Sequence, residues 1–169
     1  MRRESLEGLP VLEIPDGLKL RTFRVGDETL WAKLVSGAIG VWDEESTSQL
    51  FLGDPGVRDD GIFLLAIGAN CVATATDKRL RDTEVGYLHM VAVAPQYRGR
   101  GLGRSISLAA LLHMRGRGCK QAVLDTDDFR LPAIRTYLAL GFGPEMLEAD
   151  HPERWRRIFA ELDAARPAN

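Results

Sequence analysis

The chain has 169 residues, of which 45% are hydrophobic and 27% charged, a composition typical of ordered globular proteins and not of disordered chains. A chain of this length buries about 70% of its unfolded surface, enough for one core without disulfides or structural metal. Cys71 and Cys119 belong to no metal-binding motif, and no apolar run is long enough to span a membrane. We therefore expect one cytoplasmic domain, without a membrane anchor, over residues 1–169, with 1–17 and 166–169 at its periphery.

The net charge of −2 conceals an uneven distribution of charged residues. Residues 1–97 contain 10 basic and 15 acidic side chains, and much of the acidic excess lies in residues 43–60. Residues 98–120 contain six basic side chains and no acidic one. Such a basic run indicates either a solvated helix face or a site for an anionic ligand.

The first half of the chain predicts a strand, a helix and a hairpin. Residues 18–24 alternate apolar and polar side chains as a strand does, and Asp27 is placed as the N-cap of a helix that follows. Residues 43–60 are polar and turn-rich, which predicts a short helix with loops. Two β-rich runs within residues 61–76 predict an antiparallel hairpin, followed by a polar loop at residues 77–84.

The second half alternates predicted strands and helices. Residues 85–93 form the longest strand-like run, which ends before Pro95 because proline has no N–H for the ladder. The later elements are a helix over residues 102–116, a buried strand at 121–125, a helix with Pro132 in its first turn and Gly141 at its end, a possible strand at 141–145 and an amphipathic helix over 151–165. This order predicts an α/β or α+β fold, with a mixed central sheet flanked by helices.

A glycine-rich segment, Arg98-Gly99-Arg100-Gly101-Leu102-Gly103, joins the longest predicted strand to the next helix. Glycines let backbone N–H groups approach a ligand, and the helix N-terminus and arginines favour negative charge. The segment therefore predicts a pyrophosphate site, with a tightly packed turn as the structural alternative. No GK[ST] follows, which excludes a Walker P-loop. A dinucleotide loop stays an alternative because Asp125 lies about 20 residues further on, although Arg104 occupies the place of its third glycine.

Two sequence blocks resemble the GNAT superfamily of acyl-CoA-dependent N-acetyltransferases. In the first, Arg98, Gly101 and Gly103 match the superfamily pattern Arg/Gln-x-x-Gly-x-Gly/Ala. The second block matches Asn-x-x-Ala-x-x-x-Tyr-x-x-x-Gly-Phe at Ala133, Tyr137, Gly141 and Phe142, with Arg130 in place of the common Asn. The resemblance covers residues 85–145 well, whereas residues 1–60 match only in the order of elements. It implies a single domain of GNAT fold.

The resemblance further implies acetyl-CoA as co-substrate, without a metal. Main-chain groups of Val91, Ala92 and Val93 would bind the pantetheine arm, and the N–H near Val91 would stabilise the oxyanion formed on the thioester. The loop would bind the pyrophosphate, and Arg130 would meet a CoA phosphate. The full set of implied cofactor-binding residues is Val91, Ala92, Val93, Arg98, Gly99, Arg100, Gly101, Leu102, Gly103, Arg104, Ser105, Arg130, Ala133 and Tyr137.

Three side chains are candidates for proton transfer. The resemblance makes Tyr137 the general acid that protonates the leaving thiolate, where the structural alternative is a packed helix tyrosine. His89 and Glu84 are the candidates for the base, because histidine titrates in the useful range and strand alternation from Val91 places Tyr87 and His89 near the thioester. A structural strand histidine and a solvated glutamate are the respective alternatives.

These features predict direct transfer of acetyl from acetyl-CoA to a primary amine of a small molecule or peptide. The acidic residues 43–60 indicate either attraction of a cationic amine or ordinary loop charge. A non-catalytic acyl-CoA-binding module is the alternative. Nucleic-acid binding is disfavoured, because Tyr97 is the only aromatic residue beside the arginines and the net charge is negative. A homodimer is common in the superfamily, but no sequence feature identifies an interface.

Overall fold

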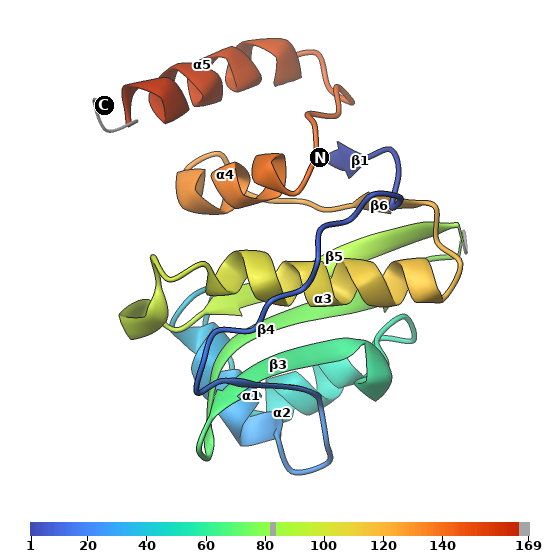
Figure 1. The fold of residues 1–169 in the computed structure, drawn as a ribbon, viewed down its shortest axis with the longest axis vertical. Coiled ribbons are helices and arrows are strands. Elements are labelled where there is room, and N and C mark those ends of the chain that lie inside the picture. Colours follow the sequence, from blue (N-terminus) through green and yellow to red (C-terminus); the bar gives the residue numbers. More distant parts are fainter. Residues whose placement is uncertain (82–83, 166–169) are drawn as a thin grey trace.

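The computed structural model describes residues 1–81 and 84–165. Six strands form one mixed sheet in the order β1-β6-β5-β4-β3-β2 (Figure 1). Neighbouring strands are antiparallel except β5 and β6, which are parallel. The strands are β1 (Arg2–Arg3), β2 (Lys19–Thr22), β3 (Ile62–Ile67), β4 (Asn70–Arg79), β5 (Val85–Val93) and β6 (Gln121–Val123). The predicted mixed sheet flanked by helices is confirmed.

Helices cover both faces of this sheet. In Figure 1, α3 crosses the near face, whereas α1 and α2 lie behind the sheet and α5 lies beyond α4. The α-helices are α1 (Glu28–Ser36), α2 (Glu44–Ser46), α3 (Leu102–Gly116), α4 (Leu131–Ala139) and α5 (His151–Ala164). A π-helical turn (Thr47–Leu52) follows α2, and 3-10 turns lie at Asp59–Gly61 and Pro95–Tyr97.

Two apolar cores hold the layers together, one on each face. Strand alternation sends Leu65 into the core that contains α3 and Leu64 into the core that contains α1. Gly86 lets α3 approach β5, because a β-carbon at this position would lie 2.5 Å from the sulfur of Met114. The Met114 side chain of α3 therefore packs directly against the backbone of β5.

A β-bulge interrupts β5 at its centre. Thr74 of β4 pairs with Ala92, and Thr76 pairs with His89, so β5 has one extra residue in this interval. Met90 within it has φ +48°, a conformation that costs energy for a residue with a side chain. The extra residue reverses the alternation, so Leu88 packs in the core of α3 and Ala92 in the core of α1.

Several predicted elements are confirmed: the hairpin β3–β4, the end of β5 before Pro95, and helices α3, α4 and α5. The loop predicted at residues 77–84 is wrong in its first part, because Asp77, Lys78 and Arg79 extend β4. The buried Asp77 carboxylate is held there by Arg117, whose Nε and Nη2 donate to it over 2.8 and 2.7 Å. Residues 82–83 of that prediction lie outside the described residues.

The chain ends differ from the sequence prediction. Residues 1–17 are not simply peripheral, because Met1 and Leu6 are buried and β1 pairs with β6. The strand proposed at 141–145 does not form, since only an isolated bridge joins Gly143 to Arg2. Residues 166–169 lie outside the described part. Within residues 1–81 and 84–165, no helix combines the length and apolarity needed to cross a membrane.

Candidate active site

The glycine-rich segment turns the chain from β5 into α3. Gly99 and Gly101 both have φ +76°, and a β-carbon on either would meet no atom within 4 Å. These glycines are therefore required by backbone conformation and not by close packing, which disfavours the packed-turn alternative at these two positions. Gly101 is the N-cap of α3 and supplies no side chain to cap it. The amides of Arg104 and Ser105 donate to the Gly101 carbonyl over 3.0 and 3.1 Å, so the donors offered to an anion are the amides that precede Arg104.

The other side chains of the loop divide between core and solvent. Leu102 is buried in the core, so only its backbone faces the loop. The Arg98 Nε donates to the carbonyl of Val93 at 3.2 Å, and the Arg100 guanidinium lies 5.3 Å from the centre of the Tyr97 ring. Arg104 is exposed. These arginines give the loop positive charge next to the N-terminus of α3.

Beside this loop, β5 and β6 part from each other. Their pairing covers only Val85 to Tyr87 of β5, and β6 ends at Val123 while β5 continues to Val93. Val91, Ala92 and Val93 therefore lie in the part of β5 that has no β6 partner. Val91 and Val93 are partly buried against the core of α3, and Ala92 is buried on the opposite face. The structure thus brings the three residues expected to bind pantetheine next to the glycine-rich loop.

Tyr137 lies on α4 and is buried. Burial raises the pKa of its phenol to about 12, and the positive charge of Arg130 opposes this shift. The ring packs edge-on against Phe142, with 6.1 Å between ring centres, and Ala133 lies one turn earlier on α4, partly buried against the same core. The phenol is therefore protonated at neutral pH and able to donate a proton.

His89 lies on the face of β5 that is directed toward α1. Its ring centre is 5.3 Å from that of Tyr87 and 6.2 Å from that of Phe51. Burial lowers the pKa of His89, Lys78 lowers it further, and Asp54 and Asp125 act in the opposite direction. Tyr87 and His89 do share a face as predicted. The alternation argument that included Val91 is wrong, because the bulge turns Val91 to the other face.

The Tyr87 hydroxyl donates a hydrogen bond of 2.9 Å to the Asp125 carboxylate. Burial, followed by this hydrogen bond and the charges of Asp125 and Tyr137, raises the pKa of Tyr87. Asp125 therefore acts electrostatically on both Tyr87 and His89. The sequence analysis considered Asp125 only as a ribose or metal ligand, and its contact with Tyr87 depends on the register of β5 and β6, which the sequence does not reveal.

Glu84 lies elsewhere. It precedes β5 at the end remote from the bulge, and its exposed carboxylate pairs with Lys120 at 2.5 Å. The structure does not bring it to Tyr137 or His89, so we do not carry Glu84 into the proposed chemistry.

Arg130, which stands where the superfamily pattern has Asn, occupies the N-cap position of α4 without a capping hydrogen bond from its side chain. Its Nε donates to Asp127 at 2.7 Å and its Nη1 to the carbonyl of Ala38 at 3.4 Å. Asp128 accepts two hydrogen bonds of 2.9 Å from Arg154. Both aspartates are thus engaged by arginines. In the described part of the chain, no group of three or more His, Cys, Asp or Glu side chains is arranged to hold a metal ion.

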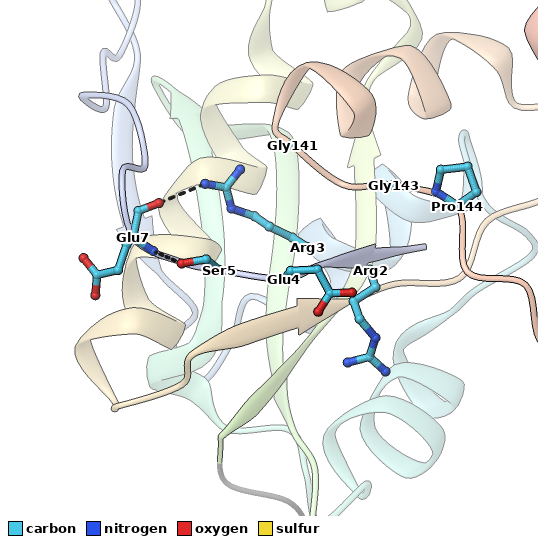
Figure 2. Close-up of a pocket in the computed structure, with 8 residues that line it drawn as sticks. All are labelled: Arg2, Arg3, Glu4, Ser5, Glu7, Gly141, Gly143 and Pro144. Atoms are coloured by element: carbon cyan, nitrogen blue, oxygen red, sulfur yellow. Dashed lines mark hydrogen bonds between the residues drawn. The ribbon is translucent and has the colours of Figure 1, made fainter.

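An open depression of about 510 Å³ lies beside β1 and the turn after α4. Figure 2 shows Arg2 and Arg3 projecting from β1 and the chain turning through Gly141 and Gly143. The Arg3 guanidinium donates to the carbonyls of Leu140 and Glu7. Gly141 has φ +82° and leaves room for this guanidinium, since a β-carbon there would overlap it. This depression contains no residue expected to bind cofactor or transfer protons.

The sequence profile of the acetyltransferase (GNAT) family matches residues 28–142. The chain belongs to this family. Two solved structures share its fold. The ribosomal-protein-S18-alanine N-acetyltransferase from Escherichia coli has a TM-score of 0.64 and 19% sequence identity, and the match covers 76% of this chain and 79% of that one. The glucosamine-6-phosphate N-acetyltransferase from Arabidopsis thaliana has a TM-score of 0.58 and 20% sequence identity, and the match covers 78% of this chain and 95% of that one.

Curated relatives give a second line of similarity. The mycothiol acetyltransferase of Thermobispora bispora is 34% identical in an alignment of 154 positions that covers 84% of this chain and 52% of that protein. The mycothiol acetyltransferase of Streptomyces bingchenggensis is 32% identical in an alignment of 140 positions that covers 79% of this chain and 46% of that protein. The chain spans about half the length of these relatives.

Proposed function

We propose that the protein transfers the acetyl group of acetyl-CoA to a primary amine of a small molecule or peptide, by direct attack in a ternary complex. The observation that carries this proposal is the pair of left-handed glycines, Gly99 and Gly101, which open the N-terminus of α3 beside the unpaired half of β5. The loop amides and arginines suit a pyrophosphate, and the exposed edge of β5 suits an extended amide-containing arm.

The expected cofactor contacts follow from this placement. Backbone groups of Val91, Ala92 and Val93 would bind the pantetheine arm, and the N–H near Val91 would stabilise the oxyanion as the amine attacks. The backbone from Arg98 to Ser105 would bind the pyrophosphate, with Arg130 directed to a phosphate from the side of α4. Holding both substrates in one geometry supplies much of the rate.

Two side chains carry the proton transfers in this proposal. His89 is neutral near pH 7, because burial lowers its pKa, and it accepts the proton that the ammonium loses, directly or through water. The nitrogen lone pair then attacks the thioester carbon, the C–S bond breaks, and Tyr137 protonates the departing thiolate. No covalent enzyme intermediate is required.

The names of the curated relatives favour a small-molecule acceptor, and mycothiol is the compound they print. The acidic residues 43–60 are a weaker argument for a cationic acceptor than their number suggests. Asp54 and Asp60 pair with Lys78 and Arg79, and Asp43 caps α2. A cytoplasmic location and a homodimer both stay predictions.

Thiol release from acetyl-CoA tests the proposal. The purified chain is incubated with acetyl-CoA and glucosamine, spermidine or lysine amide, and free thiol and acetylated amine are measured by colorimetry and mass spectrometry. We expect release that depends on at least one amine, with equal amounts of both products. Saturable acetyl-CoA binding without amine-dependent release would instead support the alternative, a non-catalytic acyl-CoA-binding module.

A further inference from the structure

The contact between Tyr87 and Asp125 spans the place where β5 and β6 part. The last paired residues are Tyr87 and Val123, so Asp125 lies two residues beyond the pairing. The hydrogen bond from the Tyr87 hydroxyl reaches across to Oδ2 of Asp125 at 2.9 Å. It fixes an exposed carboxylate at the mouth of the gap between the strands, beside the edge of β5 on which we place the pantetheine arm.

Asp125 differs from the two aspartates that follow it. Asp127 pairs with Arg130, and Asp128 pairs with Arg154. Within the described part of the chain, the hydrogen-bond partner of Asp125 is the neutral Tyr87 hydroxyl. The nearby positive charge is the N-terminal ammonium of Met1, which donates to the carbonyl of Leu124 and interacts electrostatically with Asp125. A carboxylate that accepts a hydrogen bond at one oxygen from a neutral donor leaves its second oxygen available to a cationic ligand.

The surroundings of this carboxylate contain the groups proposed for proton transfer. The His89 ring lies 5.3 Å from the Tyr87 ring, between centres. Asp125 acts electrostatically on His89, and Tyr137 acts on Tyr87. An ammonium group bound at Asp125 would therefore lie next to Tyr87 and within electrostatic range of His89, the expected base.

We propose that Asp125 binds the ammonium group of the acceptor and that Tyr87 is the positioning residue that orients this carboxylate. The inference rests on the proposed function and names its acceptor class, a primary amine that arrives protonated. The bound ammonium then gives its proton to His89 before the nitrogen attacks. Specificity for a cationic amine thus comes from one carboxylate after β6, and not from the acidic residues 43–60, three of which are already engaged.

Calorimetric titration of amines into the CoA-bound chain tests this assignment. The probes are glucosamine, spermidine and lysine amide, with glucose as the comparator that lacks an ammonium group. The variants are Asp125→Asn, Tyr87→Phe and the matched control Asp128→Asn, which changes a neighbouring aspartate paired with Arg154. We expect Asp125→Asn to weaken the best-bound amine about 10- to 100-fold, the usual effect of a hydrogen bond to a charged group.

Tyr87→Phe keeps the ring beside His89 and removes the donor, so we expect a weakening of about 3- to 10-fold. In both variants, acetyl-CoA affinity, glucose affinity and the unfolding midpoint should match the wild type, which a merely structural role would not predict. Any of three results would overturn the assignment. Asp128→Asn could weaken amine binding as much as Asp125→Asn does, Asp125→Asn could leave the amine affinity unchanged, or the wild-type chain could bind none of the three amines.

These results are distinguishable from failure of the proposed function. If amines bind through Asp125 but no thiol is released, the ammonium site stands and the transfer reaction is wrong. If thiol release is amine-dependent but insensitive to Asp125→Asn, the reaction stands and the ammonium site is wrong.

Discussion

His89 and Tyr87 lie side by side on the face of β5 that is directed toward α1, with 5.3 Å between ring centres. One residue after His89 the bulge at Met90 reverses the strand, so that Val91 packs toward α3. In the proposed ternary complex, the acceptor therefore approaches from the α1 side of β5, and the pantetheine arm follows the strand beyond the bulge.

The acid limb of the pH profile tests His89 as the base. Burial and Lys78 lower its pKa, against the opposing charges of Asp54 and Asp125, so the neutral base is present above roughly pH 6.5, its ordinary pKa. We expect kcat/KM of the wild type to fall as the pH drops through the pKa of His89, which lies below this ordinary value. In His89→Gln, this fall of kcat/KM at acid pH should disappear, together with most of the activity. An identical acid limb in wild type and variant would exclude His89 as the base.

Removal of the Tyr137 hydroxyl tests the general acid. Since the phenol stays protonated up to a pKa of about 12, Tyr137→Phe should lower kcat by roughly 10² to 10⁴ and leave the acetyl-CoA Kd unchanged. Tyr97→Phe is the matched control, because it removes a phenol hydroxyl near the loop and keeps the ring beneath Arg100. Unchanged turnover in Tyr137→Phe would contradict the role.

Gly101→Glu tests the pyrophosphate loop. It places a side chain at φ +76° and a negative charge at the N-terminus of α3, where the proposed phosphate binds. Gly68→Glu is the control, because Gly68 also has a positive φ, +57°, but lies in the β3–β4 turn. Both variants should lose about 1–2 kcal/mol of stability, whereas only Gly101→Glu should lose acetyl-CoA binding. Equal acetyl-CoA affinity in both variants would be incompatible with the site.

Asp27→Asn tests an ion pair that supports α1. The hydrogen bond from Arg21 lowers the pKa of Asp27 against the effect of burial, and the Arg24 amide contributes. Because the folded pKa lies below the unfolded one, the stabilisation is present at neutral pH and is lost as the pH falls through the folded pKa. We expect the variant to lose about 2 kcal/mol in urea unfolding near pH 7, and less near pH 3. An equal loss at both pH values would contradict this.

The regular parts of the fold could be predicted from the sequence because each carries its own local signal. A long strand-like run that ends before Pro95 defines β5, and helical spacing defines α3. The motif residues Gly99 and Gly101 also carry a local signal, since a strand-to-helix turn in the left-handed region needs glycine.

Features that depend on distant pairing could not be predicted. Asp77 reads as loop because it is charged, but Arg117, 40 residues away, holds it inside β4. The bulge at Met90 arises from the register with β4, and no residue type in this part of the sequence predicts it. The contact between Tyr87 and Asp125 likewise requires the parallel register of β5 and β6, which sequence periodicity does not contain.

Calorimetric titration of the wild-type chain with acetyl-CoA, with NADH as the comparator, tests the central claim most directly. The account predicts saturable one-to-one binding of acetyl-CoA and no binding of NADH, since Arg104 replaces the third glycine of a dinucleotide loop. Binding of NADH in place of acetyl-CoA, with Asp125 directed to a ribose, would contradict it.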